Sequence, residues 1–129
     1  MVTPVDLAHY RRDGGWLGVP FLYLPETTST NDVARREAGL GGASEGLVVV
    51  AEVQRAGRGR LKRRWSAPRG TSLLMSLLFY PEDPFTYHAS RTTMLCGLAL
   101  AEAVFSVSGV PVLLKWPNDL IMEDEHGWR

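Results

Sequence analysis

A run of arginines and glycines is the segment of this chain best suited to bind an anion. Residues 54–65 read QRAGRGRLKRRW, and no acidic residue interrupts the run. Gly57 and Gly59 lack side chains, so the backbone there can approach a ligand closely. Arg58 and Arg60 carry planar, permanently charged groups that match phosphate and carboxylate. The pattern predicts a loop that folds over an anion, with a solvated basic loop or a nucleic-acid patch as equally weighted interpretations.

Two residues flank this loop. Gln54 ends the strand expected before it, and an amide that both donates and accepts hydrogen bonds suits a neutral urea or amide group. The alternative for Gln54 is a polar residue that merely ends a strand. Trp65 could equally stack on a planar base or cap the edge of the core.

Short polar side chains open a predicted helix at Ser29, Thr30 and Asn31. Such side chains at a helix start are most often caps, and Ser29 with Asp32 has the spacing of a capping box. Free N–H groups also converge at a helix start, so the same segment can hold a polar ligand.

The segment LLKWPNDL, residues 113–120, places a lysine at the end of an apolar strand. Lys115 would be costly to bury without an anion, and the nearby Pro117 ends the strand, so the lysine is predicted at the rim of a sheet. Asn118 and Asp119 can shape a turn or orient a metal-bound phosphate. The alternative for Lys115 is a surface lysine that extends into solvent.

Composition limits the classes of function. The 129 residues carry 14 basic and 14 acidic side chains, so net charge gives no support for general affinity to nucleic acid or membranes. No apolar run reaches the roughly 20 residues that span a bilayer, no signal peptide is evident, and a reducing cytoplasm is expected. Cys96, the single cysteine, lies in an apolar helical context and is predicted to be buried and inert. The histidines lack metal-ligand spacing and are predicted to be surface or structural residues: His9, His88 and His126.

The order of apolar and turn-forming segments predicts an α+β fold, a mixed sheet with helices packed on it. Helices are expected at 4–12, from Ser29 to the glycines at 39, 41 and 42, and at 86–108, the last mostly buried. Strands are expected at 19–24, 47–53, 71–80 and 110–116, with another starting near Asn118 and followed by a turn. The strands before and after the basic loop are expected to be neighbours joined by a long connection.

Taken together, these segments resemble the catalytic domain of biotin protein ligases. Three motifs occur in that family's order and approximate spacing, from about residue 20 to the end: STN, then a strand leading into QxAGRGRxxRxW, then KWPNDL. The resemblance implies the biotin/lipoate-ligase fold, similar to class II aminoacyl-tRNA synthetases, with a mixed or antiparallel sheet and flanking helices. It also implies a cytoplasmic enzyme that joins biotin to ATP, with Mg²⁺, and passes biotin from biotinyl-5′-AMP to a lysine of a biotin carboxyl carrier protein.

The resemblance also implies roles for individual residues. Biotin would be bound by Ser29, Thr30, Asn31 and Gln54. The loop that closes on the adenylate would comprise Gly57, Arg58, Gly59 and Arg60, with Trp65 near the adenine. Lys115 would contact the biotin carboxylate and the phosphate, Asn118 would contribute to nucleotide binding, and Lys115 and Arg60 would be catalytic. No protein-held metal is expected, a homodimer is possible, and neither nucleic acid nor membrane is an expected partner.

Two departures from the family pattern carry expectations of their own. Lys62 stands where GRGRxGR has a glycine, and a lysine adopts positive φ less readily. The chain also stops within the turn after KWPNDL. Residues 1–129 are therefore expected to be a catalytic domain incomplete at its C-terminus, with neither an N-terminal DNA-binding domain nor a C-terminal β-barrel, and inactive in this form.

Two other classes of function remain as alternatives. A lipoate-type ligase would share the fold, but the chain has no match to the RRxSGGG segment of that group. A nucleic-acid-binding module would use the cations between Arg55 and Arg69, but zero net charge and the lack of interleaved aromatic residues argue against it.

Overall fold

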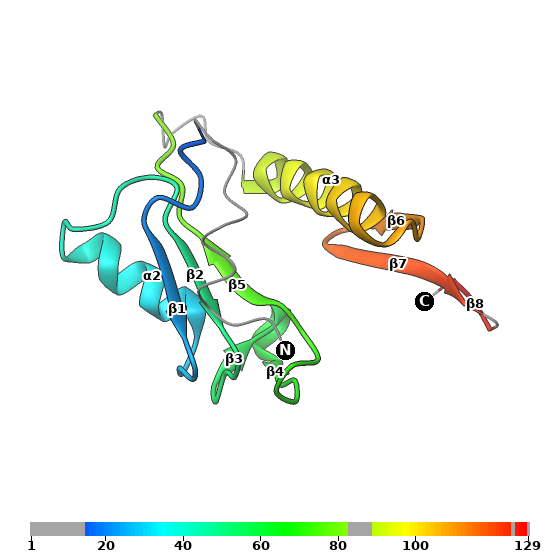
Figure 1. The fold of residues 1–129 in the computed structure, drawn as a ribbon, viewed down its shortest axis with the longest axis horizontal. Helices are drawn as coiled ribbons and strands as arrows, with labels where there is room; N and C mark the ends of the chain where they lie inside the picture. The colour runs from blue at the N-terminus through cyan, green and yellow to red at the C-terminus, as the bar shows by residue number, and fades with distance from the viewer. Residues whose placement is uncertain (1–14, 83–88, 125, 129) are drawn as a thin grey trace. The chain divides into compact units, whose positions relative to one another are not determined.

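The structure, a computed structural model, describes residues 15–82, 89–124 and 126–128, in two compact units, Met1–Tyr80 and Pro81–Arg129. The predicted helix at 4–12 lies outside the described residues. The first unit contains, in order, β1 Phe21–Leu24, α2 Thr30–Gly39, β2 Val48–Ala51, β3 Gly57–Arg58, the 3₁₀-helix η1 Arg60–Lys62, β4 Arg64–Trp65 and β5 Leu74–Leu77 (Figure 1). The second contains α3 Ala89–Ser108, β6 Val112–Lys115, β7 Asp119–Asp124 and β8 Gly127–Trp128.

The first unit is built on a three-stranded mixed sheet in the order β1-β2-β5. β1 runs parallel to β2, as a strand–helix–strand connection requires, whereas β5 runs antiparallel to β2. The predicted mixed sheet is confirmed, and so is the pairing of the strands on either side of the basic loop. All four residues of β2 are buried because it is the central strand of this sheet.

Helix α2 lies alongside the sheet in Figure 1 and contacts β2 and β5. Its apolar side chains Val33 and Ala34 form the core with Leu47 and Val49, which are 1% and 0% exposed. Burying such side chains contributes about 1.5–3 kcal/mol each for the larger aliphatic ones. The core thus holds the first half of α2 against β2, and the predicted ligand-binding side chains arise at the start of α2 and just after β2.

The start of α2 differs from the predicted capping box. The Ser29 carbonyl accepts hydrogen bonds from the backbone N–H groups of Asp32 and Val33, but the Ser29 side chain makes no capping bond. The Asp32 carboxylate instead forms an ion pair with Arg58 of β3. The capping-box prediction was therefore wrong, because a cation from another element competes for the carboxylate. The helix ends as predicted near its glycines, with Gly41 at a φ of 71°.

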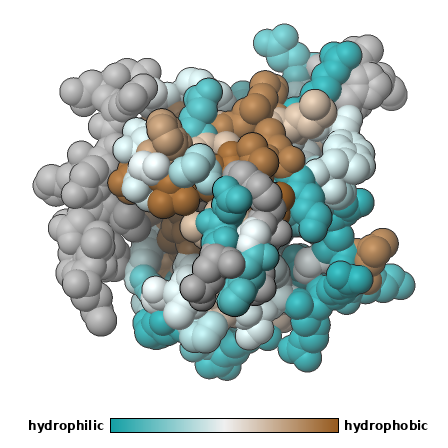
Figure 2. Space-filling model, turned by 90° about the vertical axis from the view of Figure 1, so that its right-hand side faces the viewer, coloured by the Kyte–Doolittle hydropathy of each residue, from teal (hydrophilic) through white to brown (hydrophobic). Residues whose placement is uncertain are grey.

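In the second unit, α3 packs against the antiparallel strands β6 and β7, and β8 pairs with the end of β7. The prediction that the helix is mostly buried was wrong, since none of its residues is buried. Cys96 is also exposed, and the prediction that it is buried was wrong. The helix is apolar nearly all round, but within its own unit two strands cover only one side of it. Figure 2 shows apolar side chains gathered at the molecular surface. Of the helices described, none combines the length and hydropathy needed to cross a membrane.

Candidate ligand-binding site

The basic loop is ordered by a small ribbon of its own. β3 and β4 pair antiparallel, with Gly57 opposite Trp65 and Arg58 opposite Arg64. The Gly59 N–H donates to the Arg63 carbonyl at 2.8 Å, and η1 forms the tip. Sequence analysis predicted a loop here and missed the ribbon, because strands of two residues are too short for an alternating pattern.

Gly57 is the position in the ribbon where a side chain fits least. A Cβ there would lie 2.5 Å from the Trp65 carbonyl oxygen and 3.2 Å from Nε2 of Gln54. The first contact is with backbone, which cannot move aside without opening the ribbon. Gly57 therefore allows the loop to close directly onto Gln54.

The tip of the ribbon holds two residues in an unfavourable backbone conformation. Leu61 has a φ of 56° and Lys62 a φ of 61°. This left-handed region costs an L-residue roughly 1–2 kcal/mol. The expectation that Lys62 occupies a position better suited to glycine is confirmed.

Replacing Lys62 tests this cost directly. Lys62→Gly and Lys62→Ala both remove the ammonium group, but only glycine adopts positive φ freely. We expect amide hydrogen exchange at Gly59, whose N–H bonds across the ribbon, to be about 5-fold slower in Lys62→Gly than in Lys62→Ala, from a difference of about 1 kcal/mol. Equal exchange rates in the two variants would show that the tip carries no such cost.

A cavity of about 730 Å³ opens beside the ribbon. Its lining includes five cationic side chains and no acidic one: Arg58, Arg60, Lys62, Arg63 and Arg64. The remaining lining residues are Asn31, Ala56, Gly57 and Gly59. Such a surface favours an anionic ligand, since clustered cations that repel one another are stabilised by a shared anion.

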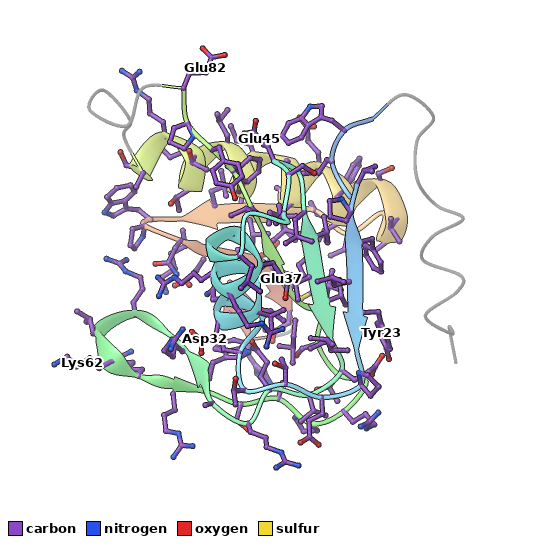
Figure 3. All side chains as sticks on the ribbon, turned by 90° about the vertical axis from the view of Figure 1, so that its left-hand side faces the viewer. Tyr23, Asp32, Glu37, Glu45, Lys62 and Glu82 are labelled. Atoms are coloured by element: carbon purple, nitrogen blue, oxygen red, sulfur yellow. The ribbon has the colours of Figure 1, made fainter. Side chains whose placement is uncertain are left out.

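Asp32 is a site residue that sequence analysis missed. It projects from α2 toward the ribbon, as Figure 3 shows, and pairs with Arg58. The side chains of Arg58 and Asp32 are 51% and 42% exposed, and such ion pairs contribute about 0–1 kcal/mol. A multiply charged anion can therefore replace Asp32 at Arg58 at little cost.

A polar cluster joins the start of α2 to the end of β2. The Thr30 N–H donates to Oε1 of Gln54 at 2.7 Å, and the Thr30 hydroxyl lies 3.1 Å from the same oxygen. Oγ of Ser76 lies 2.8 Å from the Thr30 hydroxyl and donates to Oδ1 of Asn31 at 3.0 Å. The structure thus brings together three predicted residues, together with Ser76, which looked like an isolated serine in an apolar strand.

The hydrogen bonds decide which end of Gln54 a ligand meets. A backbone N–H can only donate, so the atom of Gln54 that faces Thr30 must be the carbonyl oxygen. The Nε2 group then remains as a donor. Gln54 is thus held in one orientation rather than simply ending a strand.

The other predicted residues are distributed as follows. Ser29 is buried beside Thr30, and Trp65 is 55% exposed, which favours stacking over a role at the core edge. Lys115 ends β6 in the second unit, and Nδ2 of Asn118 donates to Asp119 at 3.0 Å in the turn that follows. The place of Lys115 and Asn118 in the site stays a prediction from the sequence.

Among the described residues, Tyr23 and His126 are titratable side chains that do not belong to the polar cluster. The phenol of Tyr23 donates to Oε1 of Glu52 at 2.8 Å, and this hydrogen bond to a carboxylate raises the pKa of Tyr23 above its ordinary value. His126 is exposed, whereas His9 and His88 lie outside the described residues. Within the described part of the chain, no group of three or more His, Cys, Asp and Glu side chains is placed to hold a metal ion.

Comparisons with known proteins agree with this geometry. The sequence profile of the Biotin/lipoate A/B protein ligase family matches residues 23–125. The bifunctional ligase/repressor BirA of Bacillus spizizenii is 33% identical over 106 residues, which are 82% of this chain and 32% of BirA. BirA of Escherichia coli K12 is 34% identical over 112 residues, 87% of this chain and 33% of its own. The chain therefore spans about a third of the length of these relatives.

Among solved structures, the biotin protein ligase from Aquifex aeolicus in complex with biotin and ATP matches with a TM-score of 0.67 and 32% sequence identity. The match covers 78% of this chain and 40% of that one. This likeness confirms the predicted α+β fold, of which the chain contains a part.

Proposed function

The chain belongs to the Biotin/lipoate A/B protein ligase family, and from that membership we propose that it supplies the biotin- and adenylate-binding part of a biotin protein ligase. The observation that carries the proposal is the junction at Asn31. This residue belongs to the polar cluster of Thr30 and Gln54 and also lines the cationic cavity. A neutral hydrogen-bonding subsite thus adjoins an anion subsite, as a biotin group joined to a phosphate requires.

The proposed first step is attack of the biotin carboxylate on the α-phosphate of ATP. It forms biotinyl-5′-AMP and releases pyrophosphate. Two anions must approach each other, and the cations of the cavity offset that repulsion and stabilise the charge that develops at the α-phosphate. Arg60 and Lys115 are the groups to which we assign this role. Mg²⁺ would enter with ATP, whose phosphates would supply most of its oxygen ligands.

The remaining assignments follow the two subsites. Ser29, Thr30, Asn31 and Gln54 would surround biotin, with the Nε2 of Gln54 donating to an acceptor of its ring. Gly57, Arg58 and Gly59 would fold the ribbon over the adenylate, and the exposed Trp65 would stack near the adenine. Asn118 would assist at the nucleotide.

The proposed second step transfers biotin to a carrier protein. A lysine amine of a biotin carboxyl carrier protein attacks the mixed anhydride, and AMP leaves with the bonding electrons of the broken C–O bond. The anhydride also reacts with water, so a ribbon that stays closed until the carrier arrives would protect it. The glycines allow that closure, and the arginines favour it once the phosphate is present.

Calorimetry tests the proposal. We expect the chain to bind biotin, to bind a non-hydrolysable biotinyl-5′-AMP analogue more tightly, and not to bind lipoate. Arg60→Gln should weaken binding of the analogue but not of biotin, because the biotin contacts lie with Thr30 and Gln54. Arg36→Gln is the matched control, since Arg36 pairs with its neighbour Glu37 and lies outside the cavity lining.

The alternatives give different outcomes in the same experiments. Binding of lipoate in place of biotin would identify a lipoate-type ligase. A salt-dependent mobility shift with DNA or RNA, without biotin binding, would identify the cationic loop as a nucleic-acid-binding surface. Equal losses of biotin and analogue in Arg60→Gln would contradict the role of Arg60 at the phosphate.

A further inference from the structure

Ser76 occupies a position in the polar cluster that neither the motifs nor the cavity lining accounts for. It lies on β5, opposite Val49 of the buried central strand, and is 8% exposed. Its hydroxyl contacts two of the proposed ligand-binding residues, Thr30 and Asn31. A buried hydroxyl with two such contacts can control how each partner presents its own polar groups.

The single hydroxyl proton of Ser76 is directed to Asn31. Ser76 donates it at 3.0 Å to Oδ1 of Asn31, an atom that can only accept. The Thr30 hydroxyl donates at 3.1 Å to Oε1 of Gln54, which also accepts from the Thr30 backbone N–H. Oγ of Ser76 lies 2.8 Å from the Thr30 hydroxyl, so the two hydroxyls are in contact.

This arrangement fixes what Asn31 offers to the cavity. With Oδ1 held by Ser76, the amide N–H₂ group is the part of Asn31 left for a ligand. Every other polar side chain in the lining is a cation, so the cavity presents donors throughout. An asparagine turned the other way would present a carbonyl oxygen, and not a donor, to biotin.

We propose that Ser76 is a positioning residue that holds Asn31 as a hydrogen-bond donor to the ligand, acting through Asn31 rather than by contact with the ligand. The proposal rests on the proposed function, in which Asn31 faces biotin. Without the Ser76 hydroxyl, Asn31 can turn its amide. The cavity lining would then include a carbonyl oxygen among its hydrogen-bond donors, while β2 and β5 stay paired.

The test compares three substitutions in the chain of residues 1–129. In Ser76→Ala, we expect the Kd for biotin to rise about 10-fold and the Kd for ATP to change by less than about 2-fold, because a misdirected amide costs about as much as one lost hydrogen bond. Ser76→Thr keeps the hydroxyl and should bind biotin nearly as the unaltered chain does. Ser44→Ala is the matched control, since Ser44 donates to the Val19 carbonyl at 3.3 Å, remote from the cluster.

A second readout follows the network without any ligand. The side-chain amide resonances of Asn31 and Gln54 in ¹⁵N spectra should shift in Ser76→Ala and stay in place in Ser44→Ala. If Ser76→Ala fails to fold, Ser76→Cys has nearly the volume of serine and a weak donor, and should show an intermediate biotin affinity together with the same shifts.

The outcomes separate this inference from the proposed function. Biotin binding by the unaltered chain and by Ser76→Ala with equal affinity would overturn the role of Ser76 and leave the proposed function standing. Equal losses for biotin and ATP would also overturn it, because a merely structural serine would act on both. Absence of biotin binding by the unaltered chain would overturn the proposed function and this inference with it.

Discussion

Gly57→Ala is expected to lower affinity for the biotinyl-5′-AMP analogue about 5- to 150-fold, the equivalent of an overpacking cost of about 1–3 kcal/mol. The new Cβ would lie 2.5 Å from the Trp65 carbonyl oxygen, so β3 and β4 must separate. It would also press on Nε2 of Gln54, at 3.2 Å, the donor assigned to biotin. One substitution thus disturbs both the ribbon and the neutral subsite. Calorimetry with biotin and with the analogue should show losses for both ligands.

Gly59→Ala is the matched control in the same ribbon. A Cβ at Gly59 would have its nearest contact at 3.5 Å, an ordinary distance, and Gly59 has a φ of −95°, which alanine adopts. We expect this variant to bind biotin, whose proposed contacts do not include Gly59, nearly as the unaltered chain does. A comparable loss of biotin affinity in both variants would mean that loop flexibility, rather than the close approach at Gly57, sets that affinity.

The sheet was predictable because its strands carry strong local signals. LVVVAEV is apolar and β-branched, and the structure buries β2 at the centre of the sheet. Proline follows the predicted strand at 19–24 directly, and the glycines after residue 38 end α2 close to where the pattern places its end. These signals depend on neighbours in the sequence, so no knowledge of tertiary structure was needed.

Three features that sequence analysis did not predict correctly depend on residues or layers distant in the sequence. Asp32 has the spacing of a capping box, but its carboxylate forms an ion pair with Arg58, 26 positions later. Ser76 became notable only when folding placed it against Thr30 and Asn31, some 45 positions earlier. Cys96 looked buried because its helix is apolar, yet burial requires a second covering layer, which the strands of its own unit do not provide.

The site was predictable in part for a different reason. The types of the residues at Asn31, Gln54 and in the arginine–glycine loop indicated which groups could bind a neutral ring and an anion. Their order along the chain matched a known family. The conformations of these residues were not predictable, because the orientation of Gln54 follows from one backbone N–H of α2.

In this chain extended to a full-length ligase, Lys115→Ala is expected to give the largest loss of activity, about 30- to 1000-fold in biotin-dependent pyrophosphate exchange, which corresponds to about 2–4 kcal/mol of transition-state stabilisation. Lys115 is exposed at the end of β6, opposite Asp119 in the β6–β7 pair. Removing an exposed side chain at a strand end should change the melting temperature little. The proposed loss therefore comes from charge at the α-phosphate and not from folding.

Two further variants make the result specific to Lys115. Lys115→Arg keeps the charge but replaces a compact ammonium with a planar fork, so exchange should recover in part. Arg91→Ala removes an exposed cation from α3 in the same unit and should leave exchange unchanged. Exchange by Lys115→Ala at the rate of the unaltered full-length ligase would contradict the catalytic assignment. An equal loss in Arg91→Ala would instead indicate that general positive charge, rather than a positioned ammonium, assists the reaction.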